Sequence, residues 1–164
     1  MTDSVALSLE QVWSALREIP DPEIPVLSLV ELGVISGVTL DGSAVHVGLR
    51  PTFSGCPALH VMRAEIEGRL ARLGANPVVV DLVLDPPWST DDLGPEARAK
   101  LAAFGLAPPP TPIVLLEEVL SAPRACPRCG STATEIRNEF GPTPCRTIHY
   151  CQSCRQPFEA MKPI

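Results

Sequence analysis

Near its C-terminal end the chain reads CPRCG at residues 126–130 and, farther on, CQSC at residues 151–154. Two Cys-x-x-Cys turns can place four thiolates around one tetrahedral ion, and Zn²⁺ is the usual occupant of such a set. Gly130 permits the positive backbone angle that a metal knuckle often uses. A segment of about 40 residues cannot bury enough surface to fold alone, so metal binding would supply its folding free energy. The spacing predicts a zinc-ribbon-like domain with the ligands Cys126, Cys129, Cys151 and Cys154.

Other interpretations of these cysteines stay open. Sites that bind iron through four thiolates use the same cysteine spacing. The two Cys-x-x-Cys pairs could also be redox-active or have no joint role. Cys145 is an additional thiol that could replace a ligand, coordinate a second ion or lie exposed, and we expect it not to bind the ribbon metal. His149 is a ligand by residue type, but four cysteines already fill the site. We therefore expect His149 to be a histidine on a strand surface.

The composition of the chain bounds its class. The 164 residues are 45% hydrophobic and 20% charged, which is enough for a packed core and allows one domain plus a small satellite. The net charge of −6 argues against strong nucleic-acid binding, because phosphate affinity needs clustered cations. No apolar run reaches the roughly 18 residues of a membrane span, and no secretory signal is visible. We therefore expect a cytoplasmic protein whose cysteines are ligands or reactive thiols rather than disulfides.

The cysteines and prolines indicate how the chain divides. Five of the six cysteines follow residue 125, where basic residues also outnumber acidic ones. The prolines in residues 108–112 predict a stiff, extended spacer. The apolar residues 113–120 could form a strand or a helix that docks on either half. We predict a first domain over 1–107, a Pro-rich linker over 108–124 and the four-cysteine ribbon over 125–164.

The first half alternates predicted helices and strands. Ser8 and Gln11 suit a capping box at the start of a helix that ends before Pro20. Residues 34–40 and 44–50 predict a hairpin, and helical spacing over 59–73 is followed by an apolar strand over 78–84. Asp91 or Asp92 could cap a third helix. The order predicts a small three-stranded sheet with packed helices, an α/β (α+β) class; no phosphate-binding glycine loop indicates a Rossmann fold.

Cys56 is the cysteine of the first half, and it follows the predicted hairpin directly. Pro57 suits the first position of the next helix, which would place Cys56 at or beside the N-cap. The helix dipole there favours a thiolate, which could act as a nucleophile or a metal ligand. The alternative is a small buried cysteine that packs a strand–helix turn.

Two carboxylates flank a proline in Asp21-Pro22-Glu23, in a rigid turn after the first helix. Such a pair could serve general acid–base chemistry, but turn acids that end a helix are more common. His46 and His60 fall on a predicted strand and helix, and we expect ordinary surface or core histidines there.

Several motifs together resemble known families. The first half resembles the SufT-like iron–sulfur assembly domain over residues 8–107. The matching motifs are Asp21-Pro22-Glu23, Leu32-Gly33-Val34-Ile35 and Thr52-x-x-x-Cys56-Pro57. With the terminal ribbon, the whole chain is similar to the PaaD (PaaJ) family of small subunits that accompany phenylacetyl-CoA epoxygenase. The further matching pieces are Pro87-Trp88-Ser89, Phe104-Gly105, Phe140-Gly141-x-Thr143-x-Cys145, Cys151-x-x-Cys154 and Pro157-Phe158.

The resemblance implies an accessory and non-catalytic role in aerobic phenylacetate degradation. Cys56 would be the cysteine of the assembly domain that binds a transient iron–sulfur cluster or iron, with Asp21, Glu23 and Thr52 beside it. The resemblance implies partners among the other epoxygenase subunits, including the reductase. Clusters usually need four ligands and Cys56 supplies one, so a homodimer could supply others. A structural Zn²⁺ would hold the ribbon.

Three rival functions remain, and the first is a purely structural subunit, for which Cys56→Ala would change nothing. A zinc-ribbon adaptor for nucleic acid or protein would have no cluster role, although the chain shows little basic clustering. A thiol enzyme would use Cys56 with Asp21 or Glu23, although no histidine is placed by the sequence to activate the thiol. We expect neither nucleic-acid nor membrane partners.

Overall fold

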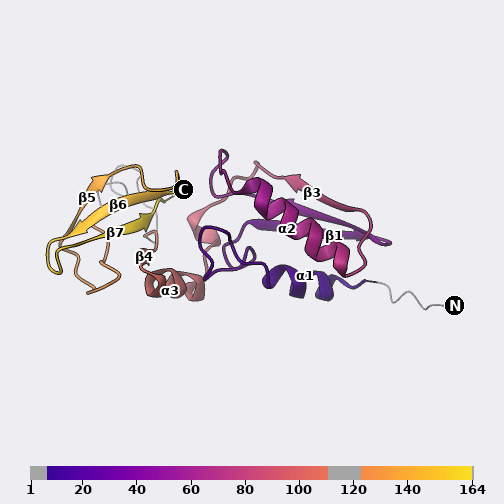
Figure 1. Ribbon diagram of the computed structural model, residues 1–164, viewed down its shortest axis with the longest axis horizontal. Coiled ribbons are helices and arrows are strands. Elements are labelled where there is room, and N and C mark those ends of the chain that lie inside the picture. The colour runs from indigo at the N-terminus through magenta and orange to yellow at the C-terminus, as the bar shows by residue number, and fades with distance from the viewer. Residues whose placement is uncertain (1–6, 111–122, 164) are drawn as a thin grey trace. The chain divides into compact units, whose positions relative to one another are not determined.

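A computed structural model describes residues 7–110 and 123–163 of the chain. The chain forms two compact units, Met1–Trp88 and Ser89–Ile164 (Figure 1). The apolar residues 113–120, for which the sequence allows a strand or a helix, lie outside the described residues. Within the described parts, none of the helices has the length and apolar character needed to cross a bilayer.

The first unit begins with helix α1 (Leu9–Arg17), and the predicted capping box is confirmed. The backbone N–H of Gln11 donates to Ser8 Oγ at 3.2 Å, and the N–H of Ser8 donates to Gln11 Oε1 at 2.9 Å. The buried face of α1 carries Val12, Ala15 and Leu16. This reciprocal cap satisfies two N–H groups at the helix start, which fixes where the helix begins.

A three-stranded sheet is the centre of the first unit. Strands β1 (Ile35–Asp41) and β2 (Ala44–Leu49) form the predicted antiparallel hairpin, and β3 (Val78–Leu82) pairs with β2 in parallel. Parallel neighbours need a crossover, which helix α2 (Leu59–Arg72) supplies. Alternate residues of β2 are buried, namely Val45, Val47 and Leu49. Helices α1 and α2 contact each other and the sheet, so the unit has the predicted mixed α and β architecture.

The loop between α1 and β1 is held by backbone hydrogen bonds. The N–H of Asp21 donates to the Leu27 carbonyl at 2.8 Å, and the N–H of Leu29 donates to the Ile19 carbonyl at 2.9 Å. Trp88 is only 2% exposed, and its Nε1–H donates to the Leu32 carbonyl at 2.9 Å. The last residue of the unit thereby locks the loop that carries two of the family motifs.

The second unit opens with a short 3-10 helix η1 (Thr90–Asp92), followed by helix α3 (Pro95–Phe104). The expectation that Asp91 or Asp92 caps the third helix is wrong. Ser89 caps η1, and the Asp92 carboxylate returns to the backbone N–H of Ser89 to complete a capping box. Gly94 stands at the N-cap of α3 because Pro95 follows at the first helical position, where a missing N–H costs nothing.

A four-stranded sheet in the order β4-β7-β6-β5 completes this unit. Its strands are β4 (Leu106–Ala107), β5 (Thr134–Asn138), β6 (Arg146–Cys151) and β7 (Gln156–Met161). The small core of this sheet combines Ala107, Cys126, Cys151, Phe158 and Ala160. The fold class predicted from the sequence, a three-stranded mixed domain followed by a zinc-ribbon-like domain, is confirmed.

The predicted domain boundaries do not coincide with this division. The sequence placed the end of the first domain at residue 107, whereas the first compact unit ends at Trp88. The reason is that β4 pairs in parallel with β7, with Leu106 opposite Glu159 and Ala107 opposite Ala160. Pro109, inside the predicted linker, is also tied to the second unit, because Arg98 Nη1 donates to its carbonyl at 2.7 Å.

The Trp88 contact yields a stability prediction. Trp88→Phe removes the indole donor and leaves the Leu32 carbonyl without this partner in a buried place, so we expect a loss of about 2 kcal/mol in unfolding free energy. Trp13→Phe is the matched control, because Trp13 is half-buried on α1. Urea unfolding monitored by circular dichroism checks both variants. Equal stabilities of the two variants would contradict a locking role for Trp88.

Candidate metal centre

Two equivalent turns present the four cysteines of the second unit. In the first turn the N–H of Gly130 donates to the Cys126 carbonyl at 2.8 Å; in the second the N–H of Arg155 donates to the Cys151 carbonyl at 2.9 Å. Gly130 has φ +73°, and Arg155 has φ +57° at the same place in its turn. Both turns thus reverse through a left-handed residue directly after their second cysteine. Glycine adopts this conformation freely, whereas arginine does so at a cost.

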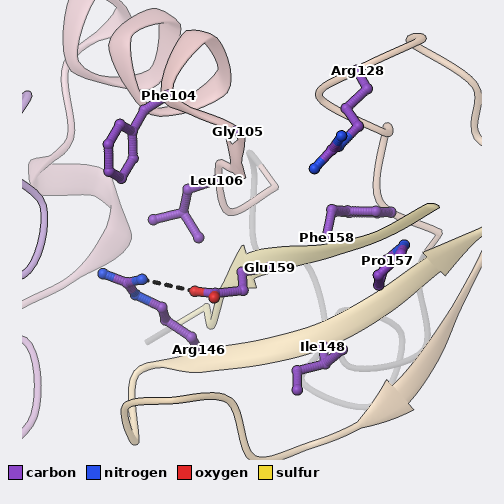
Figure 2. A pocket seen from close by; sticks show the side chains of 9 residues that line it. All are labelled: Phe104, Gly105, Leu106, Arg128, Arg146, Ile148, Pro157, Phe158 and Glu159. Carbon is purple, nitrogen blue, oxygen red and sulfur yellow. Dashed lines mark hydrogen bonds and ion pairs between the residues drawn. The ribbon is translucent and has the colours of Figure 1, made fainter.

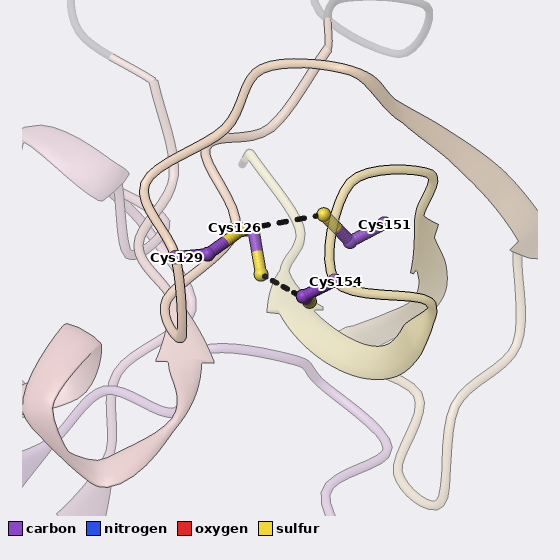
Figure 3. A group of neighbouring side chains, drawn as sticks. All are labelled: Cys126, Cys129, Cys151 and Cys154. Carbon is purple, nitrogen blue, oxygen red and sulfur yellow. Dashed lines mark hydrogen bonds between the residues drawn. The ribbon is translucent and has the colours of Figure 1, made fainter.

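The four thiol sulfurs lie close together, at distances suited to one metal ion. All four are within 4.8 Å of one another, with Cys126 Sγ to Cys154 Sγ at 3.7 Å and Cys129 Sγ to Cys151 Sγ at 3.5 Å (Figure 3). Zn–S bonds of about 2.3 Å in a tetrahedron separate the sulfurs by about 3.8 Å. The donor set therefore fits Zn²⁺, and four thiolates would close its coordination sphere as in structural sites.

The backbone around the second turn favours the charged form of one thiol. Hydrogen bonding to the backbone N–H of Cys154, with smaller help from that of Ser153, lowers the pKa of Cys151 to about 6. Burial instead raises the pKa of Cys154 to about 12. Four crowded thiols cannot all lose their protons at neutral pH without a cation, so metal binding and deprotonation are coupled.

Cys145 lies apart from this group. It is buried at the start of the β6 region, and its sulfur lies 3.2 Å from Thr143 Oγ1. Among the described residues, the group of neighbouring metal-binding side chains contains Cys126, Cys129, Cys151 and Cys154 and does not include Cys145. The geometry supports the expectation that Cys145 is not a ligand of the ribbon metal.

His149 differs from its expected place on a strand surface. It is 2% exposed, stacks on the Phe158 ring with centroids 5.4 Å apart, and has Nε2 3.0 Å from Thr147 Oγ1. Burial, and then the positive charge of Arg124, lower its pKa to about 4, so the ring is neutral at pH 7. Its position two residues before Cys151 on β6 explains the burial, because residues two apart share one face of a strand.

The segment that holds Cys56 precedes helix α2. The helix begins at Leu59 with Ala58 as its N-cap, so the expectation that Pro57 occupies the first helical position is wrong. Cys56 is half-buried; its N–H donates to the Phe53 carbonyl at 3.0 Å, and its carbonyl accepts from the N–H of Leu59 at 3.3 Å. The thiol therefore belongs to a tight turn before the helix, and Thr52 is half-buried in the same segment.

The acidic motif divides into two different environments. Asp21 is 4% exposed, and its Oδ1 accepts the backbone N–H groups of Glu23 at 2.9 Å and Ile24 at 2.7 Å. Asp21 thus closes a turn, which is the structural alternative considered for it. Glu23 is half-buried. His46 and His60 are both exposed, and His46 Nδ1 lies 3.9 Å from the Asp81 carboxylate.

The second unit also contains a hollow of about 470 Å³ beside β7 (Figure 2). Its walls come from the end of α3, from β4 and from the sheet. Its lining residues are Phe104, Gly105, Leu106, Arg128, Arg146, Ile148, Pro157, Phe158 and Glu159. Arg146 Nη1 donates to Glu159 Oε2 at 2.7 Å across this hollow, so these two charges compensate each other.

Comparisons with known proteins agree with both units. The PaaD zinc beta ribbon domain matches residues 115–162, and an iron–sulfur cluster assembly protein family matches residues 9–81. A 1,2-phenylacetyl-CoA epoxidase subunit of Escherichia coli (strain K12) is 40% identical over 95% of this chain and 93% of its own length. The chain therefore belongs to the PaaD family.

The first unit alone has further relatives. The Fe-S protein maturation auxiliary factor YitW of Bacillus subtilis (strain 168) is 31% identical over 56% of this chain and 91% of its own length. A crystal structure of a domain of unknown function, DUF59, from Bacillus anthracis has a TM-score of 0.53 at 25% identity. It covers 56% of this chain and 89% of that one, so the likeness supports the fold of the first unit.

The left-handed residues of the two turns predict opposite effects of substitution. Gly130→Ala should lower the stability of the metal-bound protein by about 1 kcal/mol, and Arg155→Gly should raise it by a similar amount. Both positions are exposed, so packing contributes little to either change. Thermal unfolding of the zinc-loaded proteins measures the two shifts. A stability loss in Arg155→Gly would contradict the equivalence of the turns.

The sulfur geometry also predicts which thiols hold the metal. Cys129→Ser should abolish stoichiometric zinc binding, whereas Cys145→Ser should retain about one Zn²⁺ per chain. Metal analysis after competition with a chelator distinguishes the two variants. Loss of zinc in Cys145→Ser, with the fold preserved by circular dichroism, would instead make Cys145 a ligand.

Proposed function

We propose that this chain, as a member of the PaaD family, is an accessory subunit that matures or supports the metal centres of a phenylacetyl-CoA epoxidase. The ring epoxidation itself would belong to another subunit. The cargo would be iron or an iron–sulfur cluster held transiently by the first unit. The ribbon, with its closed metal site, would have a structural and docking role.

The observation that carries this proposal is the place of Cys56. It lies in a half-buried turn between β2 and α2, inside the region that matches the iron–sulfur cluster assembly family. Cys56 is not in a disulfide, and it is outside the group of four neighbouring thiols. A half-buried cysteine outside the four-thiol group would suit a ligand that must be given up again.

The number of ligands supports transfer rather than storage. Clusters are usually held by four cysteine thiolates, so Cys56 alone makes an incomplete site. The remaining ligands would come from a second copy of the chain, from a client subunit such as the reductase, or from a small thiol. An incomplete site releases its cargo more readily than a saturated one.

The acidic motif has two roles in this proposal. Asp21 keeps the loop after α1 in shape through its two backbone hydrogen bonds. Glu23 keeps part of its side chain at the surface, where it could contact iron or a client subunit. Thr52 would supply a hydroxyl oxygen near the Cys56 turn.

Anaerobic reconstitution with iron and sulfide tests the proposal. The wild-type chain should bind iron and sulfide and develop the visible absorption of a cluster, and Cys56→Ser should lose both. Both proteins should keep about one zinc in the ribbon. A second assay mixes the reconstituted protein with metal-free epoxidase reductase and measures the cluster that the reductase acquires.

Cys145→Ser is the matched control, because it removes a buried thiol that lies outside the four-thiol group. It should reconstitute and transfer as the wild type does. If the wild type and every variant bind zinc but no iron, and no cluster reaches the reductase, the chain does not carry a cluster. The adaptor function would then be the better explanation, and co-purification with epoxidase subunits would test it.

A further inference from the structure

A small cavity on the second unit lies away from the four thiols and has an unusual lining. Its volume is about 150 Å³. We call it the Arg124 pocket, and its walls are Arg124, Ile136, Glu139, Phe140, Thr147, His149, Lys162 and Pro163. We propose that the Arg124 pocket binds a monocarboxylate that carries a small apolar body.

Two buried polar atoms in the lining point to a missing partner. Arg124 is 7% exposed, and in the described residues its Nη1 has no hydrogen-bond acceptor. His149 is 2% exposed, and its Nδ1 likewise has no partner there. Buried polar groups of this kind nearly always have a partner, because an unmade hydrogen bond inside a protein is costly. Arg124 Nη1 is a donor beside the cavity, and we infer that a bound group supplies its acceptor.

The charges of the lining select an anion. Arg124 keeps its positive charge at every physiological pH, and Lys162 adds a second cation. Glu139 compensates one of them, which leaves a single positive charge for a ligand. A carboxylate accepts two parallel hydrogen bonds from a guanidinium, so Arg124 would be its main partner in the pocket.

The remaining walls favour an apolar body over inorganic phosphate. Ile136, Phe140 and Pro163 line the pocket, and Phe140 is 71% exposed on the turn between β5 and β6. Lys162 Nζ lies 5.0 Å from the centre of the Phe140 ring, which orients the ring beside the cation. An exposed aromatic ring next to a cationic pocket would gain burial when an apolar ligand enters.

The size of the cavity limits the ligand. A volume of about 150 Å³ is below the range of about 300–1,000 Å³ that accommodates drug-sized molecules. The pocket therefore takes an aromatic or short aliphatic acid, or the C-terminal carboxylate and last side chain of a peptide. Both sources present the same chemistry to Arg124.

Calorimetric titration of the zinc-loaded full-length chain tests the proposal. Benzoate should bind at one saturable site, and neutral benzamide, which has the same shape, should bind at least about tenfold more weakly. A tripeptide with a free C-terminal carboxylate, compared with its C-terminal amide, separates the second source from the first. Inorganic phosphate is the probe for a plain anion site.

Variants locate the binding. Arg124→Gln should weaken the binding of the preferred acid by about tenfold or more, and Arg137→Gln is the control, because it removes an exposed cation of the same unit outside the pocket. Zinc content confirms that Arg124→Gln keeps its ribbon. If Arg124→Gln misfolds, the proposal can still be refuted, because the comparison of benzoate with benzamide uses the wild-type chain alone.

Each outcome decides the matter. Benzoate binding favours a free acid, and binding of the free peptide alone favours the tail of a partner protein. Equal binding of acids and amides would overturn the proposal, as would acid binding that Arg124→Gln leaves unchanged. Binding of phosphate with equal strength would reduce the pocket to a general anion site and overturn the claim of an apolar body.

Discussion

The second unit depends on the mutual repulsion of four thiolates and on the cation that offsets it. Two unit charges about 4 Å apart repel each other by about 4 kcal/mol at the effective dielectric constant of a protein surface. The sulfurs of Cys126, Cys129, Cys151 and Cys154 are that close. Without a cation the four thiols cannot all lose their protons at neutral pH, whereas a bound Zn²⁺ would offset the charge of four thiolates. Because Cys126 and Cys151 are also part of the small core, metal binding would stabilise the packing of β4, β6 and β7 as well.

The two units present their cysteines in different ways. In the ribbon four thiol sulfurs lie within 4.8 Å of one another, so four thiolates would close the coordination sphere of one ion. The first unit instead offers Cys56 on a turn that backbone hydrogen bonds hold in place. The sheet and the hydrogen bond from Trp88 to the Leu32 carbonyl help to hold this unit together. Under the proposed function, a cysteine outside a closed set of four would suit a ligand that must be released again, and the ribbon would serve as a docking module.

Local signals in the sequence were sufficient for most of the fold. The Ser8 capping box, the hairpin and the two Cys-x-x-Cys turns each depend on residues that are close in the chain, and each has the predicted form. The errors came from choices that local patterns cannot decide. Pro57 suits a first helical position, yet the tight turn through Cys56 delays the helix to Leu59. The short strand Leu106–Ala107 was missed because its partner, β7, lies about 50 residues farther along the chain.

The Arg124 pocket shows why part of a site escapes sequence reasoning altogether. Its residues come from the segment before β5, from β5, from the turn after it, from β6 and from the end of the chain, so no motif joins them. One signal was present, since the alternation of β6 puts His149 on the same face as Cys151. That alternation predicts burial but not an unsatisfied nitrogen, which depends on what packs around it. Arg124 gives even less indication, because its burial depends on tertiary packing. In the described residues, the lack of a partner for Arg124 Nη1 and for His149 Nδ1 is a property of the folded unit that no local sequence pattern predicts.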